Sequence, residues 1–383
     1  MATLTRLPTS PTHRRSVVLL GAGHTHLHAL KHWREQAPPG ATLTCISDYP
    51  VATYSGMLTG VLAGDYLPAA MEVPLAPLCE AANAALVVGQ VARVDLHARA
   101  VTMGDGRVVA FDLLSVGVGS TPATRGVEFD RASSGLVAIK PMQTFLARMR
   151  DALLHGRVAN EAPRVVIVGG GAAGVELALC LPTFVSATIG SHASFTLVAD
   201  GPILPDCSAG LMRRAAIALE RAGVAQLSGR VVRVADAQVH LDSGSVLDAE
   251  LIVWTTGASP RQVLSLIDLP KDSAGFLATD DTLRSTGDPR VFAVGDAGAI
   301  AERPVPKAGV YAVKQGPVLL DNLRRTLNGQ PLRPFVPQRS FLKLLNAGGG
   351  HALGEWRGVS FEGRWCRWLK ERIDTRFIAQ FQR

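Results

Sequence analysis

Five glycines in two short turns have the residue type and spacing that bind a dinucleotide phosphate. Each turn follows an apolar run, at 17–20 and at 165–168, and precedes a helical pattern. After a buried strand, such glycines let bare backbone approach a pyrophosphate, and the N–H groups at the start of the next helix hold its charge. One such turn is weak evidence, but two in one chain of 383 residues predict two bound dinucleotides. The glycines are Gly21 and Gly23 in the first turn and Gly169, Gly171 and Gly174 in the second.

A polar residue that ends the second strand of such a unit can bind the adenosine ribose. In the first unit Asp48 lies 25 positions after Gly23 (48 − 23), and Ser47 holds the strand end itself, so either residue is a candidate. In the second unit Ala199 ends the strand and Asp200 follows it. No arginine stands directly after this position to hold a 2′-phosphate, which favours NADH over NADPH.

The elements around the two turns repeat in the same order. Each half of the chain has a strand, a turn, a helix, a second strand, short antiparallel strands and a returning buried strand that runs into Gly119 or Gly257. This repeat predicts a duplicated α/β nucleotide-binding fold. The expected elements are a helix at 27–36, strands at 41–47, 86–94, 98–103, 107–111 and 111–118, a helix at 141–155, strands at 195–198, 224–234, 237–241, 251–255 and 291–294, and a helix at 308–327.

Composition narrows the class of protein. Lysine and arginine number 39 against 32 acidic residues, which is no blanket of positive charge, and no nucleic-acid-binding motif is present. Five cysteines without a C-x-x-C pair fit a reducing compartment. The apolar segment 165–190 has the hydropathy of a membrane span, but glycines, Glu176 and Pro182 interrupt it, so we interpret it as a strand, turn and helix. Residues 1–16, basic and free of acids, are expected to be a disordered leader.

With these motifs in this order, the chain resembles the flavin-dependent pyridine nucleotide oxidoreductases. It is similar to the type II NADH dehydrogenases, and especially to the oxidoreductase modules fused ahead of selenophosphate synthetase. The match rests on Gly-Ala-Gly-His-Thr-His at 21–26, Tyr-Ser-Gly-Met-Leu at 54–58, Lys-Pro at 140–141 and Pro-Lys-Ala-Gly-Val-Tyr-Ala at 306–312. The resemblance implies two Rossmann-like domains, an FAD domain (17–140 and 279–335) interrupted by an NAD(P)H domain (141–278), and a small C-terminal region (336–383).

The resemblance also implies which residues hold the cofactors. In the first unit the glycines would contact the FAD pyrophosphate, the residue that ends the second strand the adenosine ribose, and Asp296 the ribityl hydroxyls, whereas the role of His24 near the flavin is open. The expected FAD residues are Gly21, Gly23, His24, Ser47 or Asp48, Gly119, Gly295 and Asp296. The expected NAD(P)H residues are Gly169, Gly171, Gly174, Asp200 and Gly257.

The histidines near the first turn allow a second interpretation as a metal site. His28 and His32 could share a helix face, but no cysteine or acidic ligand accompanies them, so no metal is expected. His26 replaces the third glycine of the G-x-G-x-x-G pattern. It should hold the helix slightly farther from its strand.

Two charged residues are candidates for catalysis. Glu176 is the one charge in an apolar helix start and needs a partner or a function; related dehydrogenases place this glutamate beside the nicotinamide and flavin rings. Lys307 precedes a helix whose start faces the flavin pyrimidine in related flavoproteins, where an ammonium and a helix dipole would stabilise reduced flavin. The alternatives are a glutamate satisfied by backbone N–H groups at its own helix start and a solvated surface lysine.

A helix at 363–383 combines aromatic and basic side chains. This combination suits a helix that lies on a membrane surface, as the C-terminal regions of type II dehydrogenases do. An amphipathic helix packed on the protein or on a homodimer mate explains the pattern equally well. The apolar positions are Trp365, Leu369, Ile373, Phe377 and Phe381, flanked by Trp368 and Ile378, and the basic ones are Arg364, Arg367, Lys370, Arg372 and Arg376.

The sequence thus predicts an FAD-dependent NAD(P)H dehydrogenase that passes hydride to flavin and two electrons to a quinone-like acceptor. We expect it in the cytoplasm or on the inner face of a membrane, without a nucleic-acid partner. The alternative from another class is a flavin-binding redox sensor or partner module linked to selenium metabolism. A sulfide:quinone reductase needs cysteines close to the flavin, and neither Cys180 nor Cys207 is obviously placed; a disulfide reductase needs a cysteine pair that residues 45–60 lack.

Overall fold

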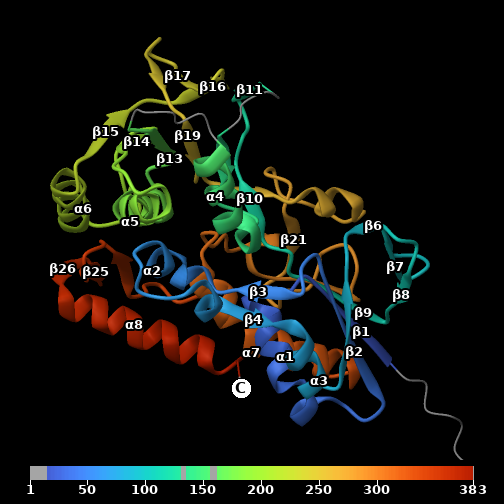
Figure 1. Ribbon diagram of the computed structural model, residues 1–383. Helices are drawn as coiled ribbons and strands as arrows, with labels where there is room; N and C mark the ends of the chain where they lie inside the picture. The colour runs from blue at the N-terminus through green and yellow to red at the C-terminus, as the bar shows by residue number, and fades with distance from the viewer. Residues whose placement is uncertain (1–14, 131–134, 156–161, 383) are drawn as a thin grey trace, which may run out of the picture. The chain divides into compact units, whose positions relative to one another are not determined.

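The computed structural model describes residues 15–130, 135–155 and 162–382. All but the last two residues of the expected leader at 1–16 lie outside this part of the chain. The chain forms two compact units, each assembled from several stretches of sequence (Figure 1). The first unit contains the chain up to residue 50, residues 75–119 and residues 260–337. The second contains residues 51–74, 120–259 and 338–383.

A five-stranded parallel sheet forms the centre of the first unit, in the order β22-β9-β1-β2-β5. Its central strands are mainly apolar in their inner parts because parallel strands are covered on both faces. Val17 and Leu19, which point to one face of β1, are as fully buried as Val18 on the other. The strands are β1 (Arg15–Leu20), β2 (Ala41–Ser47), β5 (Ala84–Val88), β9 (Leu113–Val116) and β22 (Val291–Ala293).

Helices and a small meander complete the first unit. Helix α1 packs beside α7 and α3, and the meander contributes Val94, Val101 and Met103 to the core that also contains Val18 and Leu20. The predicted antiparallel meander is confirmed as β6-β7-β8, but its first expected strand, 86–94, is split at Gly89 (φ +148°), and the part before Gly89 lies in β5, which joins the parallel sheet. The elements are α1 (His24–Gln36), α3 (Leu75–Ala81), β6 (Val91–Asp95), β7 (Ala100–Met103), β8 (Val108–Ala110), η4 (Gln262–Leu266), β21 (Leu277–Thr279), η5 (Gly295–Ala297), β23 (Gly298–Ile300) and α7 (Gly309–Leu327).

The second unit contains a second five-stranded parallel sheet, in the order β12-β19-β13-β14-β15. A smaller sheet, β11-β16-β17-β18, extends from it. The elements are β11 (Glu128–Phe129), β12 (Leu136–Ala138), η3 (Met142–Thr144), α4 (Phe145–His155), β13 (Arg164–Val168), α5 (Ala172–Ile189), β14 (Ser194–Ala199), α6 (Ala209–Arg221), β15 (Val224–Ser228), β16 (Val231–Ala235), β17 (Gln238–Leu241), β18 (Val246–Asp248) and β19 (Leu251–Trp254).

The two parallel sheets repeat the same arrangement. The order β9-β1-β2-β5 in the first unit matches β19-β13-β14-β15 in the second, and in each a glycine turn and a helix follow the strand that begins the unit. The predicted duplicated α/β fold with two Rossmann-like domains is therefore confirmed. Helix α1 begins at His24, three residues before the expected start, directly after the glycine turn.

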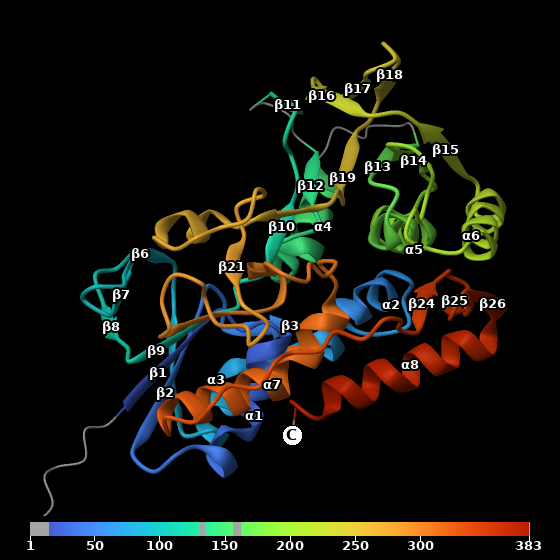
Figure 2. The same cartoon turned by 180° about the vertical axis from the view of Figure 1, so that it is seen from behind.

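The rest of the second unit comes from chain segments far from the second turn. Residues 343–363 form an antiparallel sheet, β24-β25-β26, which the sequence pattern did not predict, and α8 lies alongside it in both views (Figures 1 and 2). The elements are β3 (Val51–Thr53), η1 (Ser55–Met57), α2 (Leu58–Leu62), η2 (Pro68–Met71), β4 (Glu72–Pro74), β10 (Ser120–Pro122), β20 (Ala258–Pro260), β24 (Lys343–Asn346), β25 (Ala352–Trp356), β26 (Val359–Gly363) and α8 (Arg364–Ala379).

The boundaries of the two compact units differ from the domain boundaries expected from the sequence. Residues 260–278 belong to the first unit because Leu264, Phe276 and Leu277 fill its core. The expected C-terminal region at 336–383 is not separate: residues 338–383 belong to the second unit, where α5 contacts β24 and α6 contacts β25 and β26. Residues 51–74 also join the second unit, where α2 packs against α5.

Helix α5 is the one helix of the described residues that is long and apolar enough to cross a membrane, and half of its apolar window is buried inside the protein. The sequence pattern predicts that this segment is the helix of a β-α-β unit. The paired strands β13 and β14 on either side of it in the chain support that interpretation.

Glycine is required at position 174 by packing. A Cβ there would overlap the carbonyl oxygen of Gly169 and lie 2.9 Å from Oγ1 of Thr255. We expect Gly174→Ala to lower the free energy of unfolding by about 1–3 kcal/mol because backbone atoms would have to move. The matched control is Gly257→Ala in the same unit, where no atom lies within 4 Å and stability should not change. Urea denaturation followed by circular dichroism measures both, and equal stability of the two variants would contradict the packing argument.

Candidate functional site

The first glycine turn joins β1 to α1 at one edge of the first unit's sheet. Gly21 has φ +94°, and a Cβ on it would lie 2.6 Å from the carbonyl oxygen of Gly117, beyond the end of β9, so only glycine fits. A Cβ on Gly23 would lie 2.9 Å from the same oxygen. Gly23 caps α1 without a side-chain hydrogen bond, and the first turn of α1, which begins at His24, contains no acidic residue. Its N–H groups are therefore available to an anion.

His26 occupies the third position of this turn and is fully buried. Its Nδ1 lies 2.5 Å from the carbonyl oxygen of Gly21, and its Nε2 lies 2.8 Å from Oγ of Ser115. Burial lowers the pKa of His26 to about 4, so at neutral pH an uncharged ring donates to Gly21 and accepts from Ser115. A Cβ on Gly117 would lie 2.6 Å from the ring. A glycine in the neighbouring strand end thus makes room for the side chain that replaces the usual glycine.

The other residues expected in the first site lie at the ends of neighbouring parallel strands. Ser47 and Asp48 stand at the end of β2, Gly119 follows β9, and Gly295 and Asp296 follow β22. Because these strands belong with β1 to one parallel sheet, the five positions share its carboxyl edge. That is the edge where dinucleotides bind in open α/β sheets. No atom lies within 4 Å of the place where a Cβ on Gly119 would be.

The two candidates for the ribose position have different surroundings. Ser47 is buried, and its hydroxyl accepts a long hydrogen bond, 3.4 Å, from the N–H of Tyr49. Asp48 accepts a hydrogen bond from Nη2 of Arg261 at 2.5 Å. Nothing in the sequence pattern signals this ion pair, because 213 positions separate the two residues.

Lys307 directly precedes Ala308, the residue that caps α7, and is partly buried. Its Nζ donates to the carbonyl oxygen of Gly298 at 2.5 Å and lies 4.0 Å from the ring centre of Phe276. Burial lowers the pKa of Lys307, while the charge of Asp296 opposes this shift. The lysine is thus held by fixed partners and is not a freely solvated surface residue.

The second glycine turn joins β13 to α5. Gly169 has φ +129°, and a Cβ on it would lie 2.6 Å from Oγ1 of Thr255. Gly174 packs directly against the backbone of Gly169. Gly171 caps α5 without a side-chain hydrogen bond. Asp200 follows β14 and Gly257 follows β19, so these exposed residues share the carboxyl edge of this sheet with the turn.

Glu176 lies one turn into α5, and its carboxylate is largely buried. Oε1 accepts hydrogen bonds from Oγ1 of Thr59 at 3.1 Å and from the backbone N–H of Asn346 at 2.7 Å. Burial raises the pKa of Glu176, and the charge of Lys370 opposes this shift. The alternative interpretation, a glutamate satisfied by N–H groups at the start of its own helix, is not what the structure has. The backbone partner is Asn346 in β24.

A network of polar side chains, several of them buried, continues from Glu176, and nothing in the sequence pattern signals it. Nζ of Lys370 donates to Asp374 at 3.0 Å and to the carbonyl oxygen of Gly56 at 2.8 Å. Burial by itself lowers the pKa of Lys370, but Glu176 and Asp374 raise it above its ordinary value. The other members, by their hydrogen bonds, are Tyr54 to Asp374 (2.9 Å), Arg367 to Asp65 (2.7 Å) and Asn346 to Asp65 (3.3 Å).

Helix α8 buries three charged side chains and exposes two tryptophans. Arg367, Lys370 and Asp374 are buried, whereas Trp365 and Trp368 are 54% and 59% exposed. The expected line of apolar residues does not form one buried face, and two of the five basic residues are not at the surface. The buried bases have acidic partners: Asp65 and Glu176 come from distant parts of the chain, and Asp374 lies one turn further along α8.

The two histidines that raised the question of a metal site, His28 and His32, both lie in α1. Among the described residues, no three histidine, cysteine, aspartate or glutamate side chains are grouped so that they could hold a metal ion. The rings of His28 and His32 lie 4.6 Å apart, and burial lowers the pKa of His28 to about 4. The five cysteines are free thiols.

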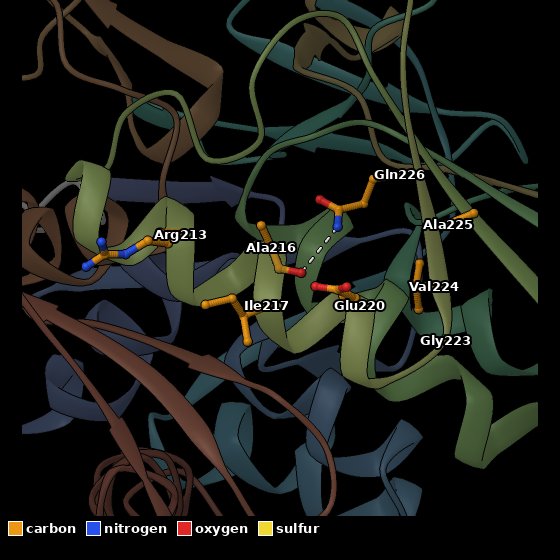
Figure 3. Close-up of a pocket in the computed structure, with 8 residues that line it drawn as sticks. All are labelled: Arg213, Ala216, Ile217, Glu220, Gly223, Val224, Ala225 and Gln226. Carbon is orange, nitrogen blue, oxygen red and sulfur yellow. Dashed lines mark hydrogen bonds between the residues drawn. The ribbon is translucent and has the colours of Figure 1, made fainter.

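A hollow of about 580 Å³ lies on the second unit between α6 and β15 (Figure 3). It borders Val224, the first residue of β15, which is parallel to β14 and β13. It therefore lies toward the edge of the sheet opposite the glycine turn and is not part of the candidate dinucleotide site. The lining residues are Arg213, Ala216, Ile217, Glu220, Gly223, Val224, Ala225 and Gln226.

Known proteins resemble the chain over almost its whole length. It is 28% identical to an NADH dehydrogenase-like protein of Mycobacterium tuberculosis, with 94% of each chain covered. It is 25% identical to the type II NADH:quinone oxidoreductase of Staphylococcus saprophyticus, with 95% of each covered. Among solved structures, NDH2 of Plasmodium falciparum in complex with NADH superposes with a TM-score of 0.78 at 14% identity, covering 96% of this chain and 98% of that one.

A second solved structure has the same fold. The sulfide:quinone oxidoreductase of Aquifex aeolicus superposes with a TM-score of 0.77 at 17% identity, covering 96% of this chain and 91% of that one. The sequence pattern of the pyridine nucleotide-disulphide oxidoreductases matches residues 15–316, which include both glycine turns and Asp296. The chain therefore belongs to the pyridine nucleotide-disulphide oxidoreductase family and is an NAD(P)H oxidoreductase.

Proposed function

We propose that this protein is an FAD-dependent NADH dehydrogenase that passes two electrons from NADH through FAD to a quinone-like acceptor. The observation that carries the proposal is the pair of glycine turns, each at the carboxyl edge of its own parallel sheet. The type II NADH:quinone oxidoreductase of Staphylococcus saprophyticus, similar over 95% of both chains, supports the choice of donor and acceptor.

The first unit has the chemistry that an FAD molecule requires. The uncapped N-terminus of α1 offers N–H groups to the pyrophosphate, and Asp296 offers a carboxylate to the ribityl hydroxyls. Ser47 or Asp48 would bind the adenosine ribose, and the empty space beside Gly119 leaves room for close approach. FAD, when bound, supplies the ring that accepts hydride and passes the two electrons on.

NADH would bind at the second turn. The uncapped N-terminus of α5, at Gly171, would receive its pyrophosphate, and Asp200 would accept a hydrogen bond from the ribose 2′-hydroxyl. NADPH is the alternative donor. The residue after Asp200 is glycine, so no arginine stands there to bind a 2′-phosphate.

Glu176 and Lys307 would act on the bound cofactors. We propose that the Glu176 carboxyl lies beside the reacting rings and holds or releases a proton, since its buried position keeps it protonated to higher pH than an exposed glutamate. We propose that Lys307, together with the uncapped start of α7, stabilises negative charge on the reduced flavin. Its hydrogen bond to the carbonyl oxygen of Gly298, the first residue of β23, fixes the position of the ammonium.

A membrane surface is the proposed location of the acceptor. On the second unit, α8 exposes Trp365, Trp368 and Ile373, and the neighbouring strands expose Trp356 and Val359. Exposed basic residues accompany them on α8: Arg364, Arg372 and Arg376. Aromatic rings beside cations suit a peripheral protein on the inner face of a membrane with anionic lipids, where a quinone would be dissolved.

Anaerobic titration tests the proposed function directly. The purified protein should be yellow, and NADH should bleach its flavin absorption, because hydride transfer reduces the bound flavin. Added quinone should then support rapid steady-state oxidation of NADH. A flavin that stays oxidised with both NADH and NADPH would contradict the proposal. One slow reduction per flavin, with no quinone-dependent turnover, would favour a redox sensor instead.

Glu176→Gln tests the proposed proton role. Glutamine can accept the hydrogen bonds of Thr59 and Asn346 but cannot titrate, so we expect kcat with quinone to fall on the order of 10²-fold. The wild-type pH profile should show one ionisation above the ordinary carboxyl range, and the variant should lack it. At neutral pH the variant should be at least as stable as wild type, because burial disfavours the ionised form that glutamine removes. Glu371→Gln, on the exposed face of α8, is the control. An unchanged kcat and pH profile in Glu176→Gln would exclude this role.

Vesicle binding tests the proposed membrane surface. Replacing both Trp365 and Trp368 with serine should weaken binding to anionic phospholipid vesicles by about tenfold or more, because the rings would otherwise enter the lipid boundary. A double variant, Leu67→Ser with Val246→Ser, removes exposed apolar side chains elsewhere on the same unit and should bind normally. Sedimentation with vesicles measures both. Equal binding of the two variants would contradict the proposal, and a concentration-dependent dimer lost in the tryptophan variant would assign the face to a second copy.

A further inference from the structure

Arg261 bridges two strand ends at the first candidate site, and none of the assignments above uses it. Its Nη2 donates to Oδ2 of Asp48 at 2.5 Å, and its Nη1 donates to the carbonyl oxygen of Val118 at 3.4 Å. All three residues belong to the first unit. Arg261 stands directly after β20 and before the short helix η4, where the chain re-enters this unit.

The two contacts place the guanidinium over the carboxyl edge of the sheet. Asp48 follows β2, and Val118 follows β9 by two residues. These strands are the two neighbours of β1, whose end carries the turn at Gly21 and Gly23. A side chain that reaches both neighbours of β1 lies across the opening in which a dinucleotide pyrophosphate binds.

Both side chains retain hydrogen-bonding capacity. A guanidinium has five N–H groups, and the contacts with Asp48 and Val118 use two of them. The hydrogen bond from Arg261 ends on Oδ2 of Asp48, which leaves Oδ1 as a further acceptor. The side chains of Arg261 and Asp48 are 32% and 26% exposed, so a ligand can reach both. A guanidinium with free donors suits a phosphate, and a carboxylate with a free oxygen suits a sugar hydroxyl.

We propose that Arg261 is a direct ligand of the FAD molecule in the first unit, an inference that rests on the proposed function. Its free N–H groups donate to an oxygen of the phosphate on the adenosine side. The same guanidinium holds Asp48 so that Oδ1 accepts a hydrogen bond from the adenosine ribose. The Arg261–Asp48 pair therefore selects a dinucleotide, because FMN lacks both the phosphate and the ribose of the adenosine half.

The ion pair between Arg261 and Asp48 is partly exposed, and such salt bridges contribute little to the free energy of folding. Removing the guanidinium should therefore leave the fold intact. The matched control is the pair of Arg93 and Asp95 on β6, at 2.7 Å in the same unit, which is exposed and does not lie at the carboxyl edge of the parallel sheet.

The test compares flavin binding by Arg261→Gln, Arg93→Gln and the wild-type holoenzyme. We measure the dissociation constants of FAD and of FMN by flavin fluorescence, and thermal unfolding after the flavin has been removed. We expect Arg261→Gln to weaken FAD binding on the order of 30-fold, the loss of charge-assisted hydrogen bonds, with FMN binding unchanged. The dependence of FAD binding on ionic strength should also decrease. Arg93→Gln should match wild type, and all three proteins should unfold at the same temperature without flavin.

Two results would overturn the proposal. The first is that Arg261→Gln binds FAD as tightly as the wild type, whose flavin is reduced by NADH. This result would leave the proposed function intact and refute only the role of Arg261. The other concerns the Asp48→Asn variant. If Arg261→Gln weakens FAD binding in the wild type but not in Asp48→Asn, and the dependence of FAD binding on ionic strength does not change, Arg261 acts only through Asp48. A wild type that binds no FAD would instead refute the proposed function itself.

Discussion

Close approach between backbone segments is the constraint on which both candidate sites depend. Gly21, Gly23, Gly169 and Gly174 lie so near neighbouring backbone that a Cβ would come within 2.9 Å of another atom. Because no side chain intervenes, each turn can direct the first N–H groups of its helix over the end of its strand. The neighbouring strands then deliver their polar ends to the same edge. The chemistry of the sites is therefore a consequence of which positions can lack a side chain.

The two turns satisfy this constraint in different ways. The second keeps its third glycine, and α5 lies directly against the backbone of Gly169. The first has His26 at this position, and the space comes from Gly117 at the end of the neighbouring strand β9. An uncharged imidazole then replaces close packing with two buried hydrogen bonds, to Gly21 and Ser115. A departure from the sequence pattern is thus compensated across the sheet, at a residue 91 positions away in the chain (117 − 26).

Buried charge organises the second unit beyond its glycine turn. Removing an ionised group from water is costly unless partners replace the water. Glu176, Lys370 and Asp374 lie together, and Arg367 pairs with Asp65. Because the buried face of α8 carries these charges, its tryptophans face outward. The exposed aromatic surface that we propose for membrane contact and the environment of the proposed catalytic glutamate are thus two sides of one helix.

The sequence by itself determined the duplicated fold, the two glycine turns and the residues at the strand ends, because these follow from local periodicity and from the backbone freedom of glycine. It did not determine the boundaries of the compact units or the sheet of β24, β25 and β26. Nor did it determine which face of α8 is buried. A periodic pattern of apolar residues predicts an apolar buried face and cannot predict that charged residues are buried as ion pairs. Only the tertiary structure brought Arg261 to Asp48 and Asn346 to Glu176. These partners are far apart in the chain, and each pairing depends on how complete sheets and helices pack.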